Sequence, residues 1–340
     1  MLTCCTNCNS SFGYMLNRKM QCPSCKKRDL CWRCVNYPII ANIAAVNGPR
    51  DAIQTQSVCQ SCFRTAVQPF LNLDAKYEVI SPPEETPAIV SLVFVHGGGG
   101  CRKMYISHAR DLAKNHRCRC VLLDLPGHGS RVNESLSLES SIATILEVTA
   151  AEAHVCHGRK PIYIGGSLGG YIGMTLLGRH PDVFSAAVIC VAGQRTGIGA
   201  SFKAKAGLTM FRVIINNFYA EKMLSLLCMA VTQNKHLMFD CIKESSLGTS
   251  MYFQQGMDQV RILAEENSAV SMASFRGPVL YCNGSLDHRD MERELLQVSQ
   301  KGDHRSRLID YDGADHFFSH DTRYYDAFLK DLITFIQDVL

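Results

Sequence analysis

The strongest candidate for a reactive side chain is Ser167, at the centre of the stretch Ile162–Gly170. Apolar β-forming residues lead into Gly-x-Ser-x-Gly, and a helical pattern follows over 171–180, which predicts a strand, a sharp turn and a helix. The flanking positions of such a turn must be glycine because a Cβ would collide with the strand or the helix. A flexible loop is the alternative, but a loop would be polar on both sides. We therefore interpret Ser167 as a nucleophile.

A glycine-rich loop provides hydrogen-bond donors for the same chemistry. The apolar run Ile89–Val95 is typical of a strand covered on both faces, and it ends in His96 followed by four glycines. Two backbone N–H groups in such a place would stabilise the oxyanion that develops during acyl transfer. We predict the N–H groups of Gly98 and Leu168 as these donors. A phosphate-binding loop is the alternative, but the Gly-Lys-Ser/Thr and Gly-x-Gly-x-x-Gly spacings fit poorly.

The elements that must position these groups alternate between strands and helices from about residue 73. Tyr77–Ile80 is predicted as an edge strand, followed by a proline-rich turn at 81–87. Further strands are predicted at 118–124, 184–191, 278–283 and 307–311, and further helices at 104–115, 137–157 and 321–340. This alternation predicts an α/β fold with a doubly wound, mostly parallel sheet.

Residues 89–191 closely resemble an α/β-hydrolase. The His-Gly-Gly loop at His96, the Asp-x-Pro-Gly-His-Gly segment at Asp124 and the Gly-x-Ser-x-Gly turn occur in that family's order and at its usual separations. In this family an acid and then a histidine follow the nucleophile along the chain. The resemblance therefore implies Asp287, just past the predicted strand 278–283, as the acid, with Asp290 as the alternative.

The same order implies His316 as the catalytic base. It follows the last predicted strand and a glycine turn, from which a loop can bring its imidazole toward Ser167. His316 would accept the proton of the Ser167 hydroxyl and then protonate the leaving group, while Asp287 would fix its tautomer. His320 is the alternative base.

The alternation breaks between Gly193 and Arg276, where the sequence becomes helical and rich in methionine and phenylalanine. An insertion at about 194–276 resembles the helical cap of the family, which lies over the site and shapes the substrate pocket. Soft apolar side chains would suit an acyl chain, although a helical lid needs a core of this kind in any case.

Nine of the seventeen cysteines fall before residue 63. Because no secretory signal precedes them, this clustering indicates metal binding rather than disulfides. The cysteines form four C-x-x-C pairs, which are Cys5 with Cys8, Cys22 with Cys25, Cys31 with Cys34, and Cys59 with Cys62, and Cys4 is spare. Two pairs complete one tetrahedral S₄ site, so the eight sulfurs predict two structural zinc ions. A module of residues 1–72 is too small to fold on a hydrophobic core alone.

The order of the four pairs and the ending Val58–Phe63 resemble a FYVE-type, RING-like finger. In such cross-braced modules the first and third pairs share one ion, and the second and fourth pairs share the other. Family members that bind phosphatidylinositol 3-phosphate carry an Arg-rich, His-His segment before the second pair, whereas Asn17–Cys22 contains no histidine. Phosphoinositide or membrane-surface contact is therefore the alternative to a packing or interaction role.

The overall charge and the distribution of apolar residues limit the kinds of molecule that the chain is expected to bind. The net charge of +4 over 340 residues, without a long basic run, argues against nucleic acid. No apolar run has the length of a membrane span, and the first residues lack the apolar core of a signal peptide. We expect no transmembrane segment and a cytoplasmic location, with peripheral contact to endomembranes as the alternative.

The sequence thus predicts a zinc-binding finger at 1–72 and an α/β-hydrolase domain at 73–340. The predicted reaction is cleavage of an ester or thioester, either a small acyl ester or a lipid, through an acyl-enzyme and without a catalytic cofactor. The alternative is a zinc-finger adaptor or targeting protein, recruited to membranes in one version, whose hydrolase domain is mainly an interaction surface. The presence of all three triad candidates argues against that alternative.

Overall fold

The computed structural model describes most of the predicted hydrolase domain and part of the cysteine-rich module. The described residues are 6, 19–35, 37–40, 55–68, 72–98, 100–131, 134–152, 158–193, 268–287, 291–321 and 323–340. The alternative acid Asp290, the cysteines Cys4, Cys5 and Cys8, and most of the predicted cap lie outside these ranges.

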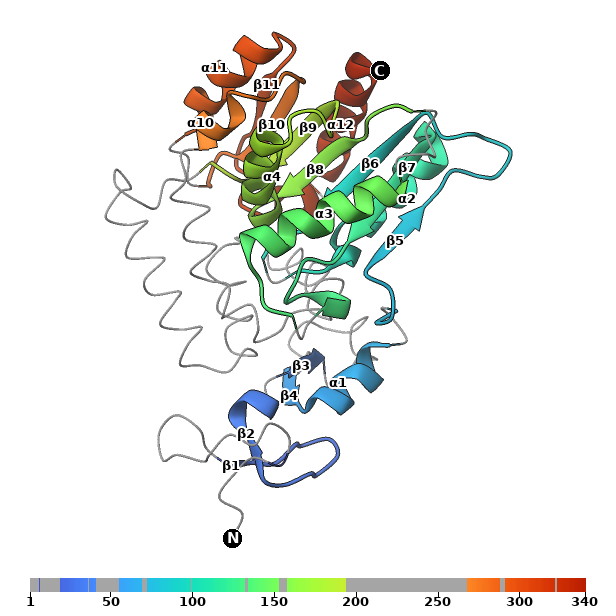
Figure 1. Cartoon of the computed structure of the whole chain (residues 1–340), viewed down its shortest axis with the longest axis vertical. Coiled ribbons are helices and arrows are strands. Elements are labelled where there is room, and N and C mark those ends of the chain that lie inside the picture. The colour runs from blue at the N-terminus through green and yellow to red at the C-terminus, as the bar shows by residue number, and fades with distance from the viewer. Residues whose placement is uncertain are drawn as a thin grey trace.

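A seven-stranded sheet forms the centre of the larger part of the chain (Figure 1), in the order β11-β10-β9-β8-β6-β7-β5. The strands are β5 (Tyr77–Ile80), β6 (Val90–Val95), β7 (Cys118–Leu123), β8 (Ile162–Gly166), β9 (Ala186–Cys190), β10 (Val279–Gly284) and β11 (Arg307–Tyr311). Edge strand β5 pairs antiparallel with β7, and all other neighbours are parallel. The predicted mostly parallel sheet is confirmed.

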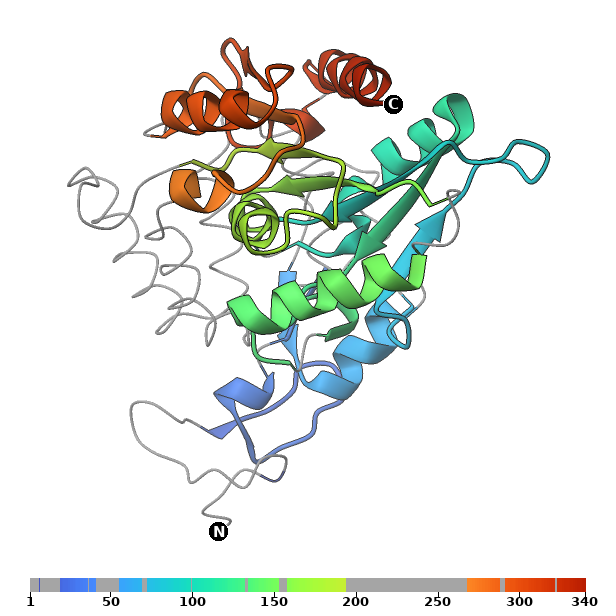
Figure 2. The ribbon, with the colours of Figure 1, turned by 45° about the horizontal axis from the view of Figure 1, so that its top comes forward.

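Helices cover both faces of the sheet (Figure 2). One face carries α3 (Leu138–Glu152), α4 (Leu168–Arg179), α10 (Ser268–Met272) and α11 (Glu292–Gly302), and the other carries α2 (Ile106–His116) and α12 (Tyr325–Val339). Side chains of one strand alternate between the two cores: Val93 and Val95 of β6 enter the first, whereas Leu92 and Phe94 enter the second. Burial on both faces explains why β6 reads as a continuous apolar run.

The predicted site residues follow the carboxyl ends of four parallel strands. The glycine-rich loop follows β6, Ser167 follows β8, Asp287 follows β10 and His316 follows β11. Because these strands run parallel, their carboxyl ends meet along one edge of the sheet, which we call the carboxyl edge. Ligands of open α/β sheets bind at such an edge, so the fold gathers all the candidates there.

The cysteine-rich module lies beyond the carboxyl edge (Figure 1). Its elements are β1 (Lys19–Met20), β2 (Leu30–Cys31), the 3₁₀ turn η1 (Trp32–Val35), β3 (Tyr37–Ile40), β4 (Thr55–Val58) and α1 (Gln60–Val67). Strands β1 and β2 pair antiparallel, as do β3 and β4. Its hydrophobic cluster, the module core, consists of Cys22, Leu30, Cys34, Val35, Val58, Cys59, Phe63 and Leu73.

Candidate active site

Ser167 lies on a sharp turn between β8 and α4. Its backbone angles, φ 50° and ψ −114°, fall outside the regions that residues with a Cβ ordinarily adopt. The Ser167 N–H donates a hydrogen bond of 2.9 Å to the carbonyl oxygen of Cys190 on the neighbouring strand β9. Within the stretch 161–170 Ser167 is partly exposed and every other residue is buried. The strained turn thus presents this residue at the carboxyl edge.

Glycines around Ser167 are required by close contacts with backbone atoms. A Cβ on Gly165 would lie 2.6 Å from the carbonyl oxygen of Gly169. A Cβ on Gly169 would lie 2.3 Å from the carbonyl oxygen of Val95 in β6. Main-chain oxygens cannot move aside as the end of a flexible side chain can, so the turn accommodates only glycine at these two positions.

The loop after β6 reaches the turn of Ser167. A Cβ on Gly97 would lie 3.4 Å from the Cβ of Ser167, and Gly98 beside it is partly exposed. The carbonyl oxygen of Gly97 accepts hydrogen bonds from the Nδ1 of His96, at 2.8 Å, and from the Gly100 N–H, at 3.1 Å. The Gly97 C=O and the Gly98 N–H point in opposite directions because they share one trans peptide. These bonds therefore orient the Gly98 N–H away from His96.

Leu168, the other predicted donor, is the first residue of α4. An N–H at the first position of a helix has no acceptor within the helix, and it carries the positive end of the helix dipole. Both predicted donors therefore belong to backbone that borders Ser167.

Buried, neutral histidines support the glycine-rich loop after β6, which carries the predicted oxyanion donor Gly98 and which we call the oxyanion loop. His96 is 1% exposed, and its Nε2 accepts a hydrogen bond of 3.1 Å from the Leu125 N–H, so both ring nitrogens are engaged. Burial lowers the pKa of His96 to about 4. The His128 ring lies 4.9 Å from it between centroids, and burial lowers the pKa of His128 to about 3. The sequence predicted the glycine-rich loop but not that His96 would hold it by hydrogen bonds. The one indication in the sequence was the position of this histidine, directly before the glycines.

Asp287 and His316 are hydrogen-bonded to each other. The Nδ1 of His316 donates to Oδ2 of Asp287 at 2.8 Å, and the two side chains are 22% and 19% exposed. With Nδ1 bound to the carboxylate, Nε2 of a neutral imidazole carries the lone pair and can accept a proton. Two of the three predicted triad members are thus paired in the geometry that a general base requires.

The loops that carry these two residues are held together by main-chain contacts. The Leu286 N–H donates to the carbonyl oxygen of Ala314 at 2.9 Å, and the Ser285 N–H donates to that of Tyr311 at 2.9 Å. A Cβ on Gly284 would lie 2.4 Å from the Ala314 oxygen, so this residue must be glycine for the loops to meet. The acid and the base are therefore positioned by one connected unit.

The alternative base His320 lies elsewhere. It belongs to the 3₁₀ turn η7 (Phe318–His320), where its ring packs 5.3 Å from that of Tyr105 and 5.6 Å from that of His108, between centroids. Its Nε2 is buried without a hydrogen-bond partner among the described residues. This environment differs from that of His316, which has a carboxylate partner.

A second strained residue borders the site and was missed from the sequence. Val191 follows β9 with φ 47°, an outlier for a β-branched side chain. Its N–H donates to the Cys282 carbonyl oxygen at 3.0 Å, and the preceding Cys190 carbonyl holds the Ser167 turn. A valine in an apolar run predicts only continued strand, so no sequence pattern indicated this conformation.

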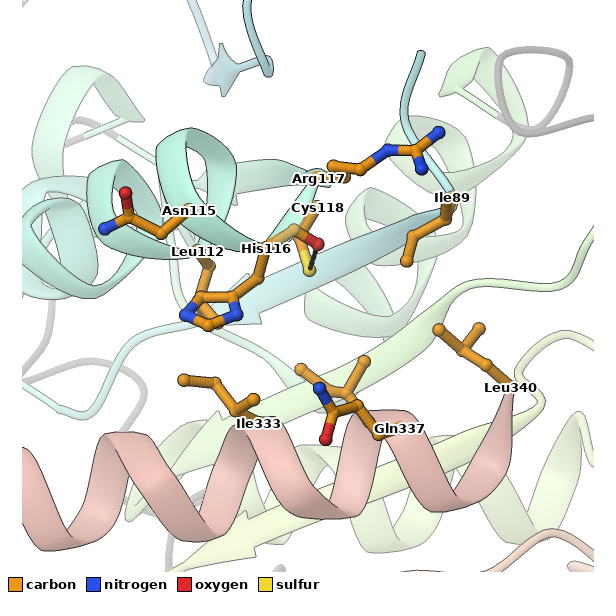
Figure 3. Close-up of a pocket in the computed structure, with 10 residues that line it drawn as sticks. Ile89, Leu112, Asn115, His116, Arg117, Cys118, Ile333, Gln337 and Leu340 are labelled. Atoms are coloured by element: carbon orange, nitrogen blue, oxygen red, sulfur yellow. Dashed lines mark hydrogen bonds between the residues drawn. The ribbon is translucent and has the colours of Figure 1, made fainter. Parts of the chain in front are cut away.

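A small cavity lies at the opposite edge of the sheet, between α2 and α12 (Figure 3). It has a volume of about 190 Å³, and Ile89 and Cys118, at the amino ends of β6 and β7, line it together with Leu112 and Ile336. None of the predicted catalytic residues lines it. The candidate site therefore rests on the carboxyl edge and not on this cavity.

Four cysteines of the module form a potential metal site. The Sγ atoms of Cys22, Cys25, Cys59 and Cys62 lie within 4.8 Å of one another. The Sγ separations are 3.8 Å for Cys22 and Cys62 and 3.6 Å for Cys25 and Cys59. A tetrahedral ion with metal–sulfur bonds of about 2.3 Å requires separations of about 3.8 Å, so the donor set fits such an ion.

This group joins the second and fourth C-x-x-C pairs, as a cross-brace requires. Of the other predicted set, Cys34 is buried in the module core, the backbone of Cys31 ends β2, and Cys5 and Cys8 lie outside the described residues. The predicted second ion remains a prediction.

The sequence matches a family model over most of the described sheet. Residues 92–330 match the Alpha/beta hydrolase family, which covers the strands from β6 to β11 and all three predicted triad residues. The chain belongs to the Alpha/beta hydrolase family. Membership makes it a hydrolase, and the parallel sheet with its strand–turn–helix at Ser167 is the fold of that family.

Solved structures share the fold of this hydrolase. The enol-lactonase from Burkholderia xenovorans LB400 has a TM-score of 0.61 at 17% identity, covering 77% of this chain and 95% of that chain. The esterase from Exiguobacterium antarcticum has a TM-score of 0.62 at 15% identity, covering 77% and 94%. The monoacylglycerol lipase of Paleococcus ferrophilus has a TM-score of 0.58 at 17% identity, covering 78% and 98%. At these identities the likeness establishes the fold alone.

Two further findings concern this α/β-hydrolase. A comparison of its sequence with curated proteins returns no significant match. In the part of the chain that the structure describes, no helix is both long enough and apolar enough to cross a bilayer.

Proposed function

We propose that the chain is a serine hydrolase that cleaves a carboxylic ester or thioester through Ser167, His316 and Asp287. The observation that carries the proposal is the 2.8 Å hydrogen bond between His316 and Asp287. This hydrogen-bonded pair follows strands at the carboxyl edge, the same edge at which the strained turn carries Ser167. The family match supports hydrolysis, and the pair supports activation of a hydroxyl nucleophile.

In the proposed acylation step, the Ser167 oxygen attacks the substrate carbonyl carbon while Nε2 of His316 takes the hydroxyl proton. Asp287 stabilises the imidazolium that forms and holds its tautomer through the Nδ1 bond. The negative charge that develops on the carbonyl oxygen is stabilised by the N–H groups of Gly98 and Leu168. His316 then gives the proton to the departing alcohol or thiol, which leaves an acyl group on Ser167.

Deacylation repeats the same proton transfers with water as the nucleophile. His316 takes a proton from the water, the hydroxide attacks the acyl carbon, and the Ser167 oxygen leaves and recovers the proton. The products are the free carboxylic acid and the regenerated serine. Because backbone donors stabilise the charge, no step of this cycle requires a metal ion.

The proposed scissile bond, a carboxylic ester, is suggested by the names of the similar solved structures and by the residues of the chain. The printed names of the similar structures are a lactonase, an esterase and a lipase, whose substrates share a carboxylic ester bond. We extend this class to the present chain and prefer an apolar acyl group, because residues 194–276 are rich in methionine and phenylalanine. The fold supports many chemistries, so the ester is the part of the proposal that kinetics must establish.

For the module we propose that Cys22, Cys25, Cys59 and Cys62 hold a structural zinc ion. Four thiolates at tetrahedral separations are the donor set that zinc prefers, and the Cys59 N–H donates to the Cys22 sulfur at 3.3 Å. The ion would stabilise the fold of the module and would take no part in hydrolysis. The FYVE-type identity remains a prediction from the sequence, and we assign the module no lipid ligand.

Acyl-enzyme trapping tests the proposed reaction. The purified full chain is mixed with p-nitrophenyl butyrate, released p-nitrophenol is followed, and quenched samples are analysed by peptide mass spectrometry. We expect butyryl on the peptide that carries Ser167 and no acyl group in Ser167→Ala. Hydrolysis that persists in Ser167→Ala, or acylation at another residue, would contradict the assignment of the nucleophile.

A further inference from the structure

One buried side chain joins the cysteine-rich module to the catalytic part of the molecule. Arg102 follows the oxyanion loop, and its side chain is 1% exposed. Its Nη1 donates to the carbonyl oxygen of Ala75 at 2.5 Å, and its Nη2 donates to that of Asn72 at 2.5 Å. A single guanidinium therefore holds the turn 72–75, at the end of the module, against the sheet.

This turn is anchored on its other side in the module core. Leu73, between the two carbonyls that bind Arg102, is 6% exposed and belongs to the cluster that contains the candidate metal ligands Cys22 and Cys59. The Leu73 N–H also donates to the side chain of Gln68 at 3.4 Å, at the end of α1. Movement of the module core would therefore move the carbonyls that Arg102 holds.

On the hydrolase side, Arg102 is fixed to the end of β7. Its Nη1 pairs with Oδ2 of Asp124 at 2.6 Å, and its backbone N–H donates to Oδ1 of the same carboxylate at 2.7 Å. Asp124 is 0% exposed, so the pair is fully desolvated. Removing hydrogen-bond partners from a buried ion pair is costly because the charge then lies uncompensated. Beyond Asp124 and the two carbonyls, Arg102 has only the Ser130 hydroxyl, 3.3 Å from Nη1, and the Glu78 carboxylate, 3.8 Å from an Nε that makes no hydrogen bond among the described residues. The two carbonyls of the turn are thus a substantial part of what stabilises this charge.

Arg102 begins the 3₁₀ turn η4 (Arg102–Tyr105), which packs against the proposed catalytic groups. A Cβ on Gly97 would lie 3.9 Å from Cε of Met104, and a Cβ on Gly166 would lie 2.2 Å from the Tyr105 hydroxyl oxygen. The turn therefore lies directly behind the peptide that carries the Gly98 N–H and behind the residue before Ser167. A shift of Arg102 would be transmitted to both.

We propose that Arg102 is a positioning residue through which the metal-loaded module holds the oxyanion loop in place. The inference rests on the proposed function, because the loop matters only if Gly98 serves as an oxyanion donor. It adds that the metal site controls catalysis from a distance, without contact with substrate. A metal that binds only the ordered module also stabilises whatever that module holds.

Hydrogen exchange on the full chain tests this coupling without any substrate. The reporters are the amides of Gly100 and Met104, which close the loop by bonds to the carbonyl oxygens of Gly97 and Cys101. The reference is the amide of Val188, in the buried strand β9. Removal of bound metal with a strong chelator should accelerate exchange of the two reporters about tenfold and leave Val188 protected.

Two variants break the connection while the metal stays bound. Leu73→Ala removes the contact with the module core, and Arg102→Lys keeps a charge for Asp124 but cannot reach both carbonyls with a planar fork. Both should show fast reporter exchange before chelation and little further change after it. Arg131→Lys is the matched control, because Arg131 is also buried but pairs with Glu134 and Thr144 and not with the turn.

Two results would overturn the inference. The first is chelation that loosens the module, seen at Cys59 and Phe63, while Gly100 and Met104 remain protected in the wild type. If chelation also accelerates exchange at Val188, the whole chain has opened, and the reporter amides of metal-loaded Leu73→Ala then provide the second test. Slow reporter exchange in that variant would then contradict the coupling.

Kinetics distinguish positioning from a merely structural role. With p-nitrophenyl butyrate, Arg102→Lys should lower kcat about tenfold at unchanged KM, because a misplaced oxyanion donor affects the transition state and not binding. Loss of folded protein would instead lower the fraction of chains that a fluorophosphonate titrates. If the wild type shows no esterase activity the proposed function fails, whereas the exchange experiment still decides the coupling.

Discussion

The carboxyl edge of the sheet and the cysteine-rich module are stabilised in different ways. The edge lies between two extensive hydrophobic cores, and its loops are joined by main-chain hydrogen bonds such as that from Leu286 to Ala314. The module core is small, and two of its members are the candidate ligands Cys22 and Cys59. The geometry of the carboxyl edge is therefore set by packing, whereas so small a module would depend on the metal ion that we propose for its four cysteines.

Both regions hold non-glycine residues with positive φ. Ser167 and Val191, both with positive φ, lie at the carboxyl edge, where surrounding strands fix the backbone. Strain of about 1–3 kcal/mol for each such residue persists only where neighbouring structure over-determines the conformation. In the module, Lys26 and Asp29 also have positive φ, at 60° and 58°, so backbone strain by itself does not distinguish the two regions.

The largest expected effect is on the acid of the proposed triad. Asp287→Asn should lower kcat for ester hydrolysis about 10⁴-fold, because an amide no longer holds the His316 tautomer that can accept a proton. The thermal midpoint should change little, since the side chain is partly exposed. The control is Asp312→Asn, an exposed residue in the neighbouring loop after β11, which should keep kcat within about twofold of the wild type. A loss below tenfold in Asp287→Asn would refute the assigned acid.

One cysteine substitution made in each region sharpens the comparison. Cys59→Ser should abolish binding of one metal ion and unfold the module while the sheet stays folded, because its core cannot replace the metal. Cys282→Ser, in the buried strand β10, should keep the metal and cost the hydrolase about 1–3 kcal/mol for a buried hydroxyl. Metal content by atomic emission, together with the unfolding midpoints, measures both. Equal metal content in the two variants would contradict the metal site.

A single methyl group should break the carboxyl edge. Gly169→Ala should destabilise the hydrolase by about 3 kcal/mol, because the new Cβ would lie 2.3 Å from the carbonyl oxygen of Val95. Gly158→Ala is the control: nothing lies within 4 Å of its Cβ, and φ is 75°. Its cost should be about 1 kcal/mol, from the left-handed backbone alone. Urea unfolding measures both, and equal costs would rule out the steric account.

The smallest predicted effect concerns pH. Burial lowers the pKa values of His96 and His320 to about 4 and those of His108 and His128 to about 3, from an ordinary 6.5. The unfolded chain therefore binds more protons below pH 6.5, so stability is complete above that pH and is lost as pH falls toward these values. Each histidine should contribute a slope of up to about 1.4 kcal/mol per pH unit.

His108→Phe tests this slope. His108 packs against Tyr325, with centroids 4.4 Å apart, so a phenyl ring can replace it at the cost of one hydrogen bond to the Ser319 carbonyl. Between pH 6.5 and 5 the free energy of unfolding should fall by about one quarter less in the variant than in the wild type, because one of these four histidines is removed. Carboxylates contribute mainly below this window, since Arg131 holds the pKa of Glu134 below its ordinary 4.5. An unchanged slope would exclude burial of a neutral His108.

Much of the sheet could be predicted because its signals are local. The apolar run before His96 and the strand Arg307–Tyr311 were expected where the structure has them, since a continuous apolar run marks the buried β6 and a glycine turn follows the partly buried β11. Ser167 could be proposed from its strand–turn–helix pattern, and Asp287 and His316 from the chain order of the family that the sequence resembles and from the predicted strands that they follow. Two helices differ: the segment predicted at 104–115 begins as the 3₁₀ turn η4 and continues as α2, and the helix predicted at 321–340 begins only at Tyr325.

The features that escaped prediction depend on contacts distant in sequence. Arg102 reads as a surface charge, and only the fold brings it to Asp124 and to the carbonyls of the turn 72–75. The φ of Val191 depends on its bond to β10, which no local pattern encodes. Residue type and spacing thus predict which chemistry is present, whereas the fold determines what holds it in position.

Labelling with a fluorophosphonate probe tests the central claim most directly. The metal-loaded full chain and its Ser167→Ala variant are treated side by side, and the modified residue is located by mass spectrometry. We predict stoichiometric labelling of Ser167 in the wild type and none in the variant, because only an activated serine attacks the probe. Absence of labelling in folded wild type, or equal labelling of the variant, would contradict a Ser167-centred hydrolase.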